Sequence, residues 1–359
     1  MRRRVLIYGA TGYTGRLITA RLRNSRSKLV IAGRSSQRVQ ALAAQLGVTG
    51  WVMSPDDPNA LDEALGDVDV LINAASPFAL TASPLIQSCL RTRTHYLDIT
   101  GELPVFQDAF GYDDAARERG IMIMPGTGLG IVASDCLAMH VASLVPSAKY
   151  LRIGLSRPSS FSRGTFRSAL GLANSRVSIR RNGQLMSLPI GRLQRTFDFG
   201  DGEKQSVAVS WADVFTAWHS TGIRNIEAYF EADFASRTFY QLGAGVADAM
   251  QLLPAKTLID AVTSVLPEGP TEVQRRAERC VIVAEAENTW RQTRCVRLET
   301  PDGYSFTAEA TAAIAQRVMR GDFVSGFQTP ARVYGADLVL EFEGTHREEI
   351  RDAFSAHAT

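Results

Sequence analysis

The sequence predicts an α/β protein in which a doubly wound parallel sheet of the Rossmann type precedes a second α+β domain with a mostly antiparallel sheet. Over the first 125 residues, short β-branched runs alternate with segments whose apolar residues recur at helical spacing. That alternation is typical of a parallel sheet with right-handed crossover connections. After residue 127, longer amphipathic runs with hairpin-type turns replace it. The length of 359 residues suggests about two domains.

The first domain is expected over residues 1–127. Its strands are predicted at residues 5–8, 29–32, 50–53, 68–72, 95–99 and 121–124. Its helices are predicted at residues 14–24, 37–46, 60–65, 84–91 and 105–119. A parallel sheet built this way collects the carboxyl ends of its strands at one edge, where the ligands of such sheets bind.

The second domain, residues 128–325, is expected to supply a substrate pocket and a surface for homodimer formation. Its strands are predicted at residues 150–155, 177–181, 195–199, 226–232, 281–287 and 294–299, with hairpin-type turns at 181–183 and 301–303. Its helices are predicted at residues 211–219, 236–253 and 307–320. Beyond it, residues 330–334 predict a short helix and residues 338–342 an apolar strand.

Composition excludes several classes of function. The chain has 39 basic and 37 acidic residues, a net charge of +2 that gives no general case for nucleic acid. Four scattered cysteines and five histidines form no CxxC, HxxxH or HExxH pattern, so neither a metal site nor a disulfide framework is expected. The first apolar run is too short for an export signal, and no membrane-length apolar stretch follows. We therefore expect a cytoplasmic protein with a small-molecule substrate, no nucleic-acid partner and no membrane span.

The strongest motif is a glycine turn, GATGYTG, which follows the first predicted strand directly and opens a helix. In a Rossmann unit, such glycines permit a tight turn, let the backbone approach a pyrophosphate, and let helix and strand pack closely. The phosphates then bind the free N–H groups of the helix N-terminus. The motif predicts dinucleotide contacts from Gly9, Thr11, Gly12, Tyr13, Thr14 and Gly15.

The end of the second predicted strand indicates which dinucleotide is bound. NAD-preferring domains place a carboxylate there for the ribose hydroxyls, but this chain has no acidic residue before Asp56. It has Arg34 and Ser35 instead, and residues 1–55 hold ten basic groups. A guanidinium pairs well with a 2′-phosphate. The sequence therefore predicts NADP(H) as the cofactor.

Small residues follow the fourth predicted strand, after Asn73. In the usual strand order, this strand lies next to the first, across the point where the order reverses. Small side chains there would leave room for a cofactor, and an aromatic ring could stand beside it. The segment therefore predicts cofactor contacts from Ala74, Ala75, Ser76, Pro77 and Phe78. The alternative is that it forms an ordinary loop without a ligand.

Polar residues gather at the end of the fifth predicted strand. Reduction of a C=N or C=C bond needs a proton as well as a hydride, so a positioned acid or a water must lie near the acceptor. Tyr96, Asp98 and Glu102 are the catalytic candidates. The alternative is that Asp98 and Thr100 cap the following helix.

A glycine-rich loop, PGTGLG, ends the sixth predicted strand and precedes Ser134, Asp135 and Cys136. Ser134 or Asp135 would cap the next helix. A cysteine near a helix N-terminus can have a lowered pKa, which admits a cysteine-dependent semialdehyde dehydrogenase, although a buried helical cysteine is the simpler interpretation. The Tyr-x-x-x-Lys mechanism of short-chain dehydrogenases is excluded, because none of the nine tyrosines has a lysine four positions on.

Taken together, these segments resemble the saccharopine dehydrogenase-like family of NADP-dependent oxidoreductases, which includes the trans-acting enoyl reductases. The similarity rests on GATGYTG, AGR at 32–34, NAASPF at 73–78, HYLDITGE at 95–102, SD at 134–135, PDGY at 301–304 and GFQTPA at 326–331. It implies that residues 326–359 return to the Rossmann domain. The loop at 126–133 departs from the family pattern, which leaves the substrate class open.

The resemblance and the motifs give one leading function and two alternatives. The leading one is an NADPH-dependent reductase that transfers hydride to a C=N or conjugated C=C bond of a small metabolite or lipid-like substrate. The alternatives are the semialdehyde dehydrogenase that uses Cys136 and a non-catalytic regulator that senses NADP(H).

Overall fold

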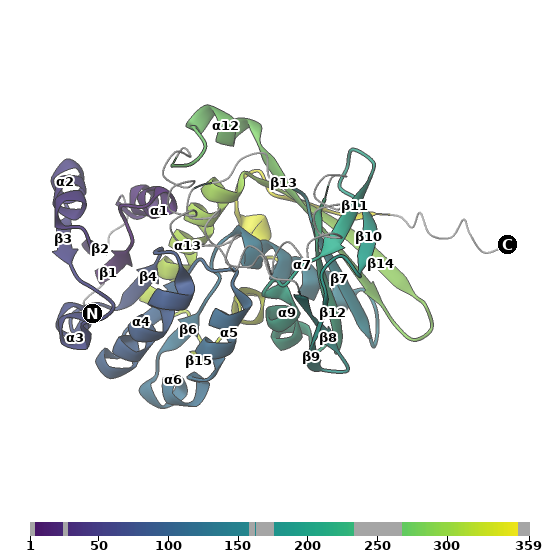
Figure 1. Ribbon diagram of the computed structural model, residues 1–359, viewed down its shortest axis with the longest axis horizontal. Helices are drawn as coiled ribbons and strands as arrows, with labels where there is room; N and C mark the ends of the chain where they lie inside the picture. Colours follow the sequence, from purple (N-terminus) through teal and green to yellow (C-terminus); the bar gives the residue numbers. More distant parts are fainter. Residues whose placement is uncertain (1–3, 24–27, 158–161, 163–175, 233–267, 351–359) are drawn as a thin grey trace.

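The structure is a computed structural model that describes residues 4–23, 28–157, 162, 176–232 and 268–350. The described residues form two sheets at opposite sides of the molecule, with helices between and around them (Figure 1). The expected α/β class, with a parallel first sheet and a mostly antiparallel second one, is confirmed. The predicted helix at 236–253 lies outside the described residues.

The first sheet has seven strands in the order β15-β6-β5-β4-β1-β2-β3, all parallel. Its central strands are almost fully buried and β-branched, as expected for a sheet covered on both faces. The bounds are β1 Arg4–Tyr8, β2 Lys28–Gly33, β3 Thr49–Val52, β4 Val70–Asn73, β5 His95–Asp98, β6 Met122–Met124 and β15 Gly326–Phe327.

Capping residues set the ends of several of the helices that connect the strands of the first sheet. Ser35 and Asp57 cap α2 and α3 through their side chains, and Gly47 ends α2 in the left-handed conformation. The segment predicted as one helix at 105–119 is two, because the first ends at Gly111. The bounds are α1 Tyr13–Arg23, α2 Ser36–Leu46, α3 Pro58–Leu65, α4 Phe78–Thr92, α5 Leu103–Phe110 and α6 Asp113–Arg119.

The second sheet runs in the order β10-β11-β12-β7-β13-β14-β16, with the β8–β9 hairpin attached to β12. Only the pair β7 and β12 is parallel among the described strands of this sheet. The expected turn at 181–183 closes the β8–β9 hairpin, with both Asn182 and Gly183 at positive φ. The bounds are β7 Tyr150–Leu155, β8 Arg176–Arg181, β9 Gln184–Pro189, β10 Gln194–Asp198, β11 Glu203–Ala208, β12 Asn225–Glu231, β13 Arg279–Glu287, β14 Thr293–Pro301 and β16 His346–Ile350.

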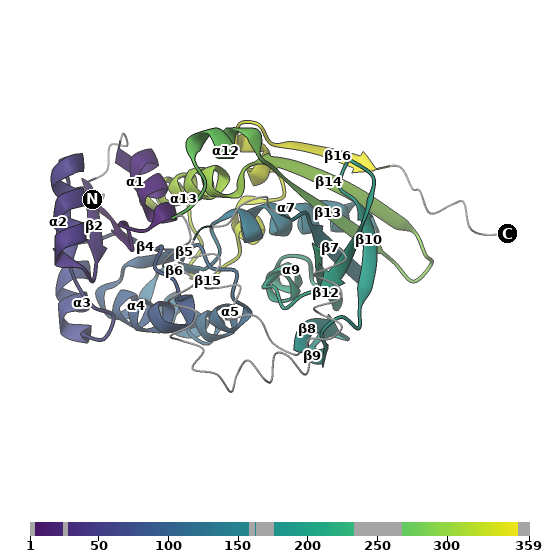
Figure 2. The same ribbon diagram turned by 45° about the horizontal axis from the view of Figure 1, so that its top comes forward.

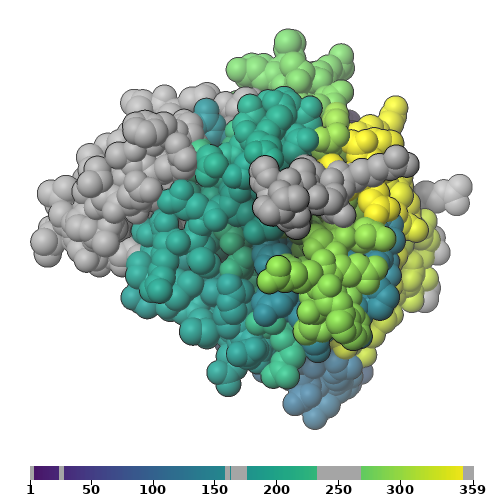
Figure 3. Space-filling view, turned by 90° about the vertical axis from the view of Figure 1, so that its right-hand side faces the viewer, coloured from purple at the N-terminus to yellow at the C-terminus, as the bar shows by residue number. Residues whose placement is uncertain are grey.

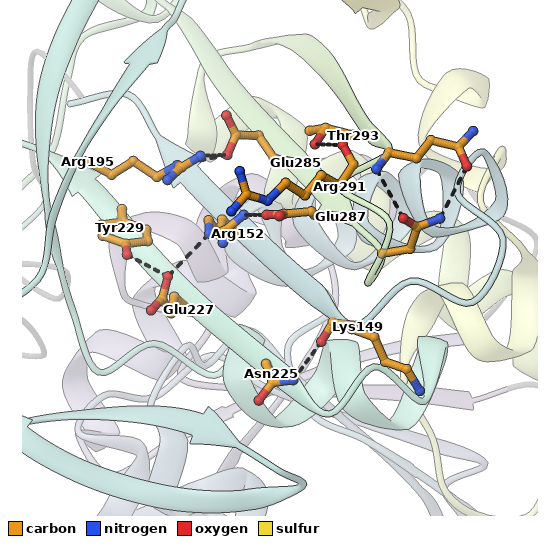
Figure 4. A network of polar contacts seen from close by, with 12 residues as sticks. Lys149, Arg152, Arg195, Asn225, Glu227, Tyr229, Glu285, Glu287, Arg291 and Thr293 are labelled. Atoms are coloured by element: carbon orange, nitrogen blue, oxygen red, sulfur yellow. Dashed lines mark hydrogen bonds and ion pairs between the residues drawn. The ribbon is translucent and has the colours of Figure 1, made fainter. Parts of the chain in front are cut away.

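The second sheet lies at the side of the molecule that Figure 3 shows, and charged side chains on one of its faces pair with one another (Figure 4). Arg152 contacts Glu227 and Glu287, at 3.7 and 2.8 Å. Arg195 pairs with Glu285 at 2.5 Å. Burial raises the pKa of Glu285, and the adjacent Arg195 opposes that rise. These charged side chains therefore pair within the sheet.

The other face of the second sheet packs on α7 (Leu129–Ser143), a helix that lies between the two sheets in Figure 1. Residues 131–138 of α7 are all buried, which explains why the helix has no polar side over this length. Next to it lies α13 (Gly303–Met319), which also packs against α1 and the strands β4 and β5 (Figure 2). Although it belongs to the range expected for the second domain, α13 therefore covers the first sheet.

Three local expectations are wrong. The turn predicted at 301–303 is the start of α13, where the Asp302 side chain accepts hydrogen bonds from the amides of Tyr304 and Ser305. The apolar segment predicted as a strand at 338–342 is a 3₁₀ helix (Leu338–Glu341). Ser134 and Asp135 do not cap α7, because its N-cap is Gly128. The remaining helices are α9 Asp213–Thr221, α12 Glu272–Ala277 and α14 Pro330–Tyr334.

Candidate functional site

The glycine turn lies at the carboxyl edge of the first sheet, between β1 and α1. Gly9 has a φ of +83°, and a Cβ there would come within 2.8 Å of the Ala74 backbone. A Cβ on Gly15 would overlap the Gly9 carbonyl oxygen, so both positions need glycine. A Cβ on Gly12 would meet only the Gly9 oxygen within 4 Å. The turn is thus tight on its inner side and open above Gly12.

The N-terminus of α1 has the donors that a pyrophosphate requires. Within the described part of the chain, no acceptor takes the amide hydrogens of Tyr13, Thr14 or Gly15, and the first helical bond runs from the Arg16 amide to the Gly12 carbonyl. Three free amides at the positive end of a helix form an anion site. The predicted dinucleotide turn therefore fits a dinucleotide phosphate.

Arg34 lies at the end of β2 with an exposed side chain. Burial raises the pKa of Tyr8 to about 12, and the Arg34 guanidinium opposes this rise, which places Arg34 near the end of β1. Among the described residues, no carboxylate pairs with Arg34. The Ser35 hydroxyl accepts a hydrogen bond from the Arg38 amide at 3.4 Å, and so serves α2 as its cap. The guanidinium is available to a phosphate.

The segment after β4 is fixed by the Asn73 side chain. Its Nδ2 donates to the hydroxyls of Thr81 and Tyr96, at 3.0 and 3.1 Å, and its Oδ1 accepts from the Ala75 amide at 3.0 Å. Ala74, Ala75, Ser76 and Pro77 form the loop that leads into α4. Phe78 is only 6% exposed and packs into the core. The loop backbone faces the glycine turn, since Ala74 and Ala75 approach Gly9.

Tyr96, Asp98 and Glu102 lie together at this edge, and each has partners inside the protein. The Asp98 carboxylate accepts from the amides of Thr100 and Gly126, at 2.9 and 2.8 Å, and from the Tyr96 hydroxyl at 2.9 Å. Burial raises the pKa of Asp98 to about 7, and these hydrogen bonds oppose the rise. Burial also raises the pKa of Tyr96 well above its usual range.

Glu102 reaches across to the beginning of α4. Its carboxylate oxygens accept from the amides of Phe78 and Ala79, at 3.4 and 3.2 Å. A carboxylate at this place caps the helix and complements its dipole. Tyr96 and Asp98 are both fully buried, whereas Glu102 retains 8% exposure. The three candidates thus tie the ends of β4, β5 and β6 to one another.

The loop after β6 joins this edge to α13. The Thr127 hydroxyl donates to the Asp98 carbonyl at 2.8 Å and lies 3.1 Å from the Thr311 hydroxyl, which can donate to the Thr127 carbonyl at 3.1 Å. The Leu129 amide donates to the Thr307 hydroxyl at 3.0 Å. These bonds position the N-terminus of α7 over the ends of β5 and β6.

Trp211 is a site residue that the sequence did not single out. It precedes α9, and its indole lies against two glycines of the carboxyl edge: a Cβ on Gly101 would come within 2.6 Å of the ring, and one on Gly130 within 2.8 Å. Phe230 of β12 packs against the same indole, with ring centroids 5.0 Å apart. The segment before α9, supported by the second sheet, thereby places an aromatic ring at this edge. No spacing rule marks a tryptophan for that position.

Cys136 is fully buried in α7, and burial raises the pKa of its thiol well above the usual range. The neighbouring Asp135 carboxylate accepts from the Ser220 hydroxyl at 2.6 Å and from the Ala331 amide at 2.9 Å, joining α7 to α9 and α14. Burial raises the pKa of Asp135 to about 6. Both residues serve packing and connection between helices.

In the ranges that the structure describes, no group of three histidine, cysteine or acidic side chains could hold a metal ion. The same ranges contain no helix that is long and apolar enough to cross a membrane.

Comparison with known proteins bears on the first domain above all. Residues 5–124 match the family described as the saccharopine dehydrogenase NADP binding domain. A trans-acting enoyl reductase of Mycobacterium ulcerans (strain Agy99) is 30% identical over 145 residues, 38% of this chain and 35% of that protein. One from Mycobacterium leprae (strain TN) is 32% identical over 139 residues, 36% of this chain and 33% of that protein. The chain spans about a third of the length of these two relatives.

Two solved structures share the fold over nearly the whole chain. Apo saccharopine dehydrogenase (L-Glu forming) from Saccharomyces cerevisiae has a TM-score of 0.65 at 15% identity, covering 97% of this chain and 100% of that one. Homospermidine synthase from Legionella pneumophila, in complex with NAD, has a TM-score of 0.64 at 10% identity, covering 96% and 91%. At such identities, the likeness concerns the fold.

Proposed function

We propose that this chain is an NADPH-dependent reductase, because residues 5–124 match the saccharopine dehydrogenase NADP binding domain. The proposed reaction transfers hydride to a C=N or conjugated C=C bond of a small metabolite or lipid-like substrate. The observation that carries the proposal is the phosphate site at the start of α1. No described residue accepts a hydrogen bond from the amides of Tyr13, Thr14 or Gly15, and no described carboxylate pairs with Arg34.

The two bond types follow from the two kinds of relative. Trans-acting enoyl reductases match the first domain in sequence, which supports a conjugated C=C bond. The saccharopine dehydrogenase structure shares the fold alone, and reduction of a C=N bond is the second form of the proposal. Either substrate would bind at the carboxyl edge of the first sheet, where Trp211 adds an apolar wall.

NADPH supplies the hydride when bound, and the chain supplies position and a proton. We propose that Asn73, Tyr96 and Asp98 hold the loops of the edge, because their hydrogen bonds all end within the protein. Glu102, the most exposed of the three catalytic candidates, is the proposed proton relay: its carboxylate takes a proton from water and passes it to the acceptor.

Turnover with defined substrates tests the proposal. The chain would be supplied with NADPH and either an α,β-unsaturated thioester or an aldehyde with an amine, which form an imine in solution. Oxidation of NADPH that requires one of these substrates is the expected result, and NADH should replace it poorly. Tight NADPH binding with no turnover on either class would favour the non-catalytic sensor instead.

The cysteine-dependent semialdehyde dehydrogenase has no structural observation in its favour. A nucleophilic cysteine needs access and a lowered pKa, whereas Cys136 is fully buried and its pKa is raised. Cys136→Ser should therefore keep most of the reductase turnover. A folded Cys136→Ser variant that binds NADPH but has no turnover would instead support the semialdehyde mechanism.

A further inference from the structure

A short segment that leads into α12 (Glu272–Ala277) and includes its first residues contacts the first turn of α1. We name residues 268–275 the clasp. The Tyr13 hydroxyl donates to the Pro270 carbonyl at 2.5 Å, and Nη1 of Arg275 donates to the same hydroxyl at 2.6 Å. The Tyr13 ring also packs edge-on against Tyr304, with centroids 5.1 Å apart. A single side chain of the nucleotide-binding turn thus contacts α12 and α13 together.

Two further contacts fix the clasp to the same helix. Gly269 lies directly on the Tyr13 ring, since a Cβ there would come within 2.6 Å of it. The Glu268 carboxylate pairs with Arg16, whose other nitrogen donates to the Thr11 carbonyl at 2.8 Å. Contacts from Glu268, Gly269 and Pro270 therefore fall on the first turn of α1, at Tyr13 and Arg16.

The clasp itself is stiffened locally. Thr271 and Gln274 form a capping box that starts α12. Arg275 donates to Ser305 at 3.3 Å and to the Pro270 carbonyl at 3.2 Å, and it lines a cavity of about 370 Å³ between α1 and α13. Because this guanidinium borders open space, its position depends on these few hydrogen bonds. Among the described residues, no carboxylate pairs with it.

We propose that Tyr13 is a positioning residue that couples NADP(H) binding to the clasp. Its amide lies among the free donors that a pyrophosphate would bind, while its side chain carries the contacts to Pro270 and Arg275. An anion that binds here and orders the first turn of α1 also orders the Tyr13 side chain. Pro270 and Arg275 of the clasp then contact a hydroxyl that is held in place. By reciprocity, the clasp favours the conformation of the turn that binds the dinucleotide. The inference rests on the proposed NADP(H) binding and adds a contribution from outside the Rossmann domain.

Hydrogen exchange of the clasp tests the coupling without any substrate. Amide exchange in a peptide that covers residues 268–277 would be measured with and without saturating NADPH, in the parent protein and in Tyr13→Phe. The parent should show slower exchange in the presence of NADPH. Tyr13→Phe keeps the ring but lacks the hydroxyl, so its clasp should show little NADPH-dependent slowing.

Binding measurements give the second readout. Tyr13→Phe removes both hydrogen bonds of the hydroxyl, and Arg275→Ala removes the bond from Arg275 to it. Each variant should bind NADPH about 3- to 10-fold more weakly, with partial recovery in Arg275→Lys. Tyr112→Phe is the matched control, because its hydroxyl contacts Ser83 and Gln87 on another face of the domain. It should bind NADPH like the parent and keep the exchange effect.

The outcomes separate this inference from the proposed function. A parent protein that does not bind NADPH contradicts the proposed function itself. A parent that binds NADPH without slowing exchange in the clasp contradicts the coupling alone. Equal slowing in the parent and Tyr13→Phe does the same. If Tyr13→Phe does not fold, the Arg275→Ala and Arg275→Lys pair decides by the same two measurements.

Discussion

The indole N–H of Trp211 donates to the carbonyl oxygen of Gly130 at 3.0 Å. Gly130 lies in the first turn of α7, and its carbonyl also accepts from the Ser134 hydroxyl at 3.0 Å. The bond joins the segment before α9 to the carboxyl edge of the first sheet. The same ring touches Gly101 after β5. The Trp211 side chain thereby fixes the spacing between the loop after β5 and the first turn of α7 at the proposed active site.

Gly101→Ala should disturb that spacing. The new methyl group would lie within 2.6 Å of the Trp211 ring, so the indole or the loop must shift. We expect a loss of roughly 1–3 kcal/mol in the free energy of unfolding, as for other overpacked positions, and a larger effect on turnover than on NADPH affinity. Gly66→Ala is the control, because its Cβ would meet nothing closer than 3.5 Å. Chemical denaturation and kinetics check both variants, and equal behaviour of the two would contradict the prediction.

Arg34→Ala should reduce NADPH affinity by about 10- to 100-fold, because it removes one or two charged hydrogen bonds to the 2′-phosphate. NADH binding should barely change, because NADH has no 2′-phosphate. Arg23→Ala removes the same charge from the other end of α1, where its side chain is exposed, and should change neither affinity much. Fluorescence titration with both cofactors gives the comparison. Equal losses for NADPH and NADH in Arg34→Ala would refute the assignment.

Asp98→Asn and Glu102→Gln should separate a structural role, in which a side chain holds the loops in place, from a role in proton transfer. Asp98 accepts three hydrogen bonds in a fully buried place, so Asp98→Asn should lower the melting temperature. Glu102→Gln keeps an oxygen that can cap α4, and it should lower turnover about 100-fold with NADPH affinity retained. Asp108→Asn, on the exposed face of α5, serves as the control. Unchanged turnover in Glu102→Gln would remove it from the mechanism.

Asp213 should make the stability of the protein depend on pH. Its carboxyl group is fully buried, neither oxygen accepts a hydrogen bond from the described residues, and the nearby Ser134 hydroxyl donates to backbone carbonyls instead. Burial raises its pKa to about 8, above the value of about 3.9 in an unfolded chain. Folding therefore favours the protonated form, and stability should fall as the pH rises from about 4 through 8.

Asp213→Asn removes that titration. The free energy of unfolding of Asp213→Asn minus that of the parent should be greater at pH 9 than at pH 5 by roughly 4 kcal/mol, because the parent loses about 1.4 kcal/mol for each pH unit between 5 and 8. Asp201→Asn provides the matched control, because Asp201 has a side chain that is 73% exposed. Denaturation curves at both pH values give the four free energies. Parallel pH profiles for the parent and Asp213→Asn would show that Asp213 does not titrate as stated.

Much of the fold follows from local sequence patterns, because buried parallel strands and their helices have strong periodicity. The six predicted strands of the first sheet and the glycine turn agree closely with the structure. The seventh strand, β15, has two residues and no periodicity of its own. The edge strand β16 reads HREEI and pairs only with β14, so it carries no apolar alternation that would reveal a strand.

The site was predictable only where a backbone rule applies. Glycines, strand ends and a missing acidic residue indicated the turn and Arg34. The partners of Asp98 and Glu102 come from other strand ends and could not be deduced from spacing. Trp211 and Arg275 reach the site from distant parts of the chain. Such contacts depend on how the second sheet and α13 pack against the first domain, which no local pattern encodes.

The late position of β15 has a consequence for synthesis of the protein. Gly326 and Phe327 complete the first sheet beside Met122 and Ile123, but the ribosome makes them only after the whole second sheet except β16. Until then, β6 is an open edge with unpaired backbone groups, which can recruit other strands. Nascent or truncated chains that stop before residue 326 should therefore aggregate more readily than the finished protein, and would depend on chaperones during elongation.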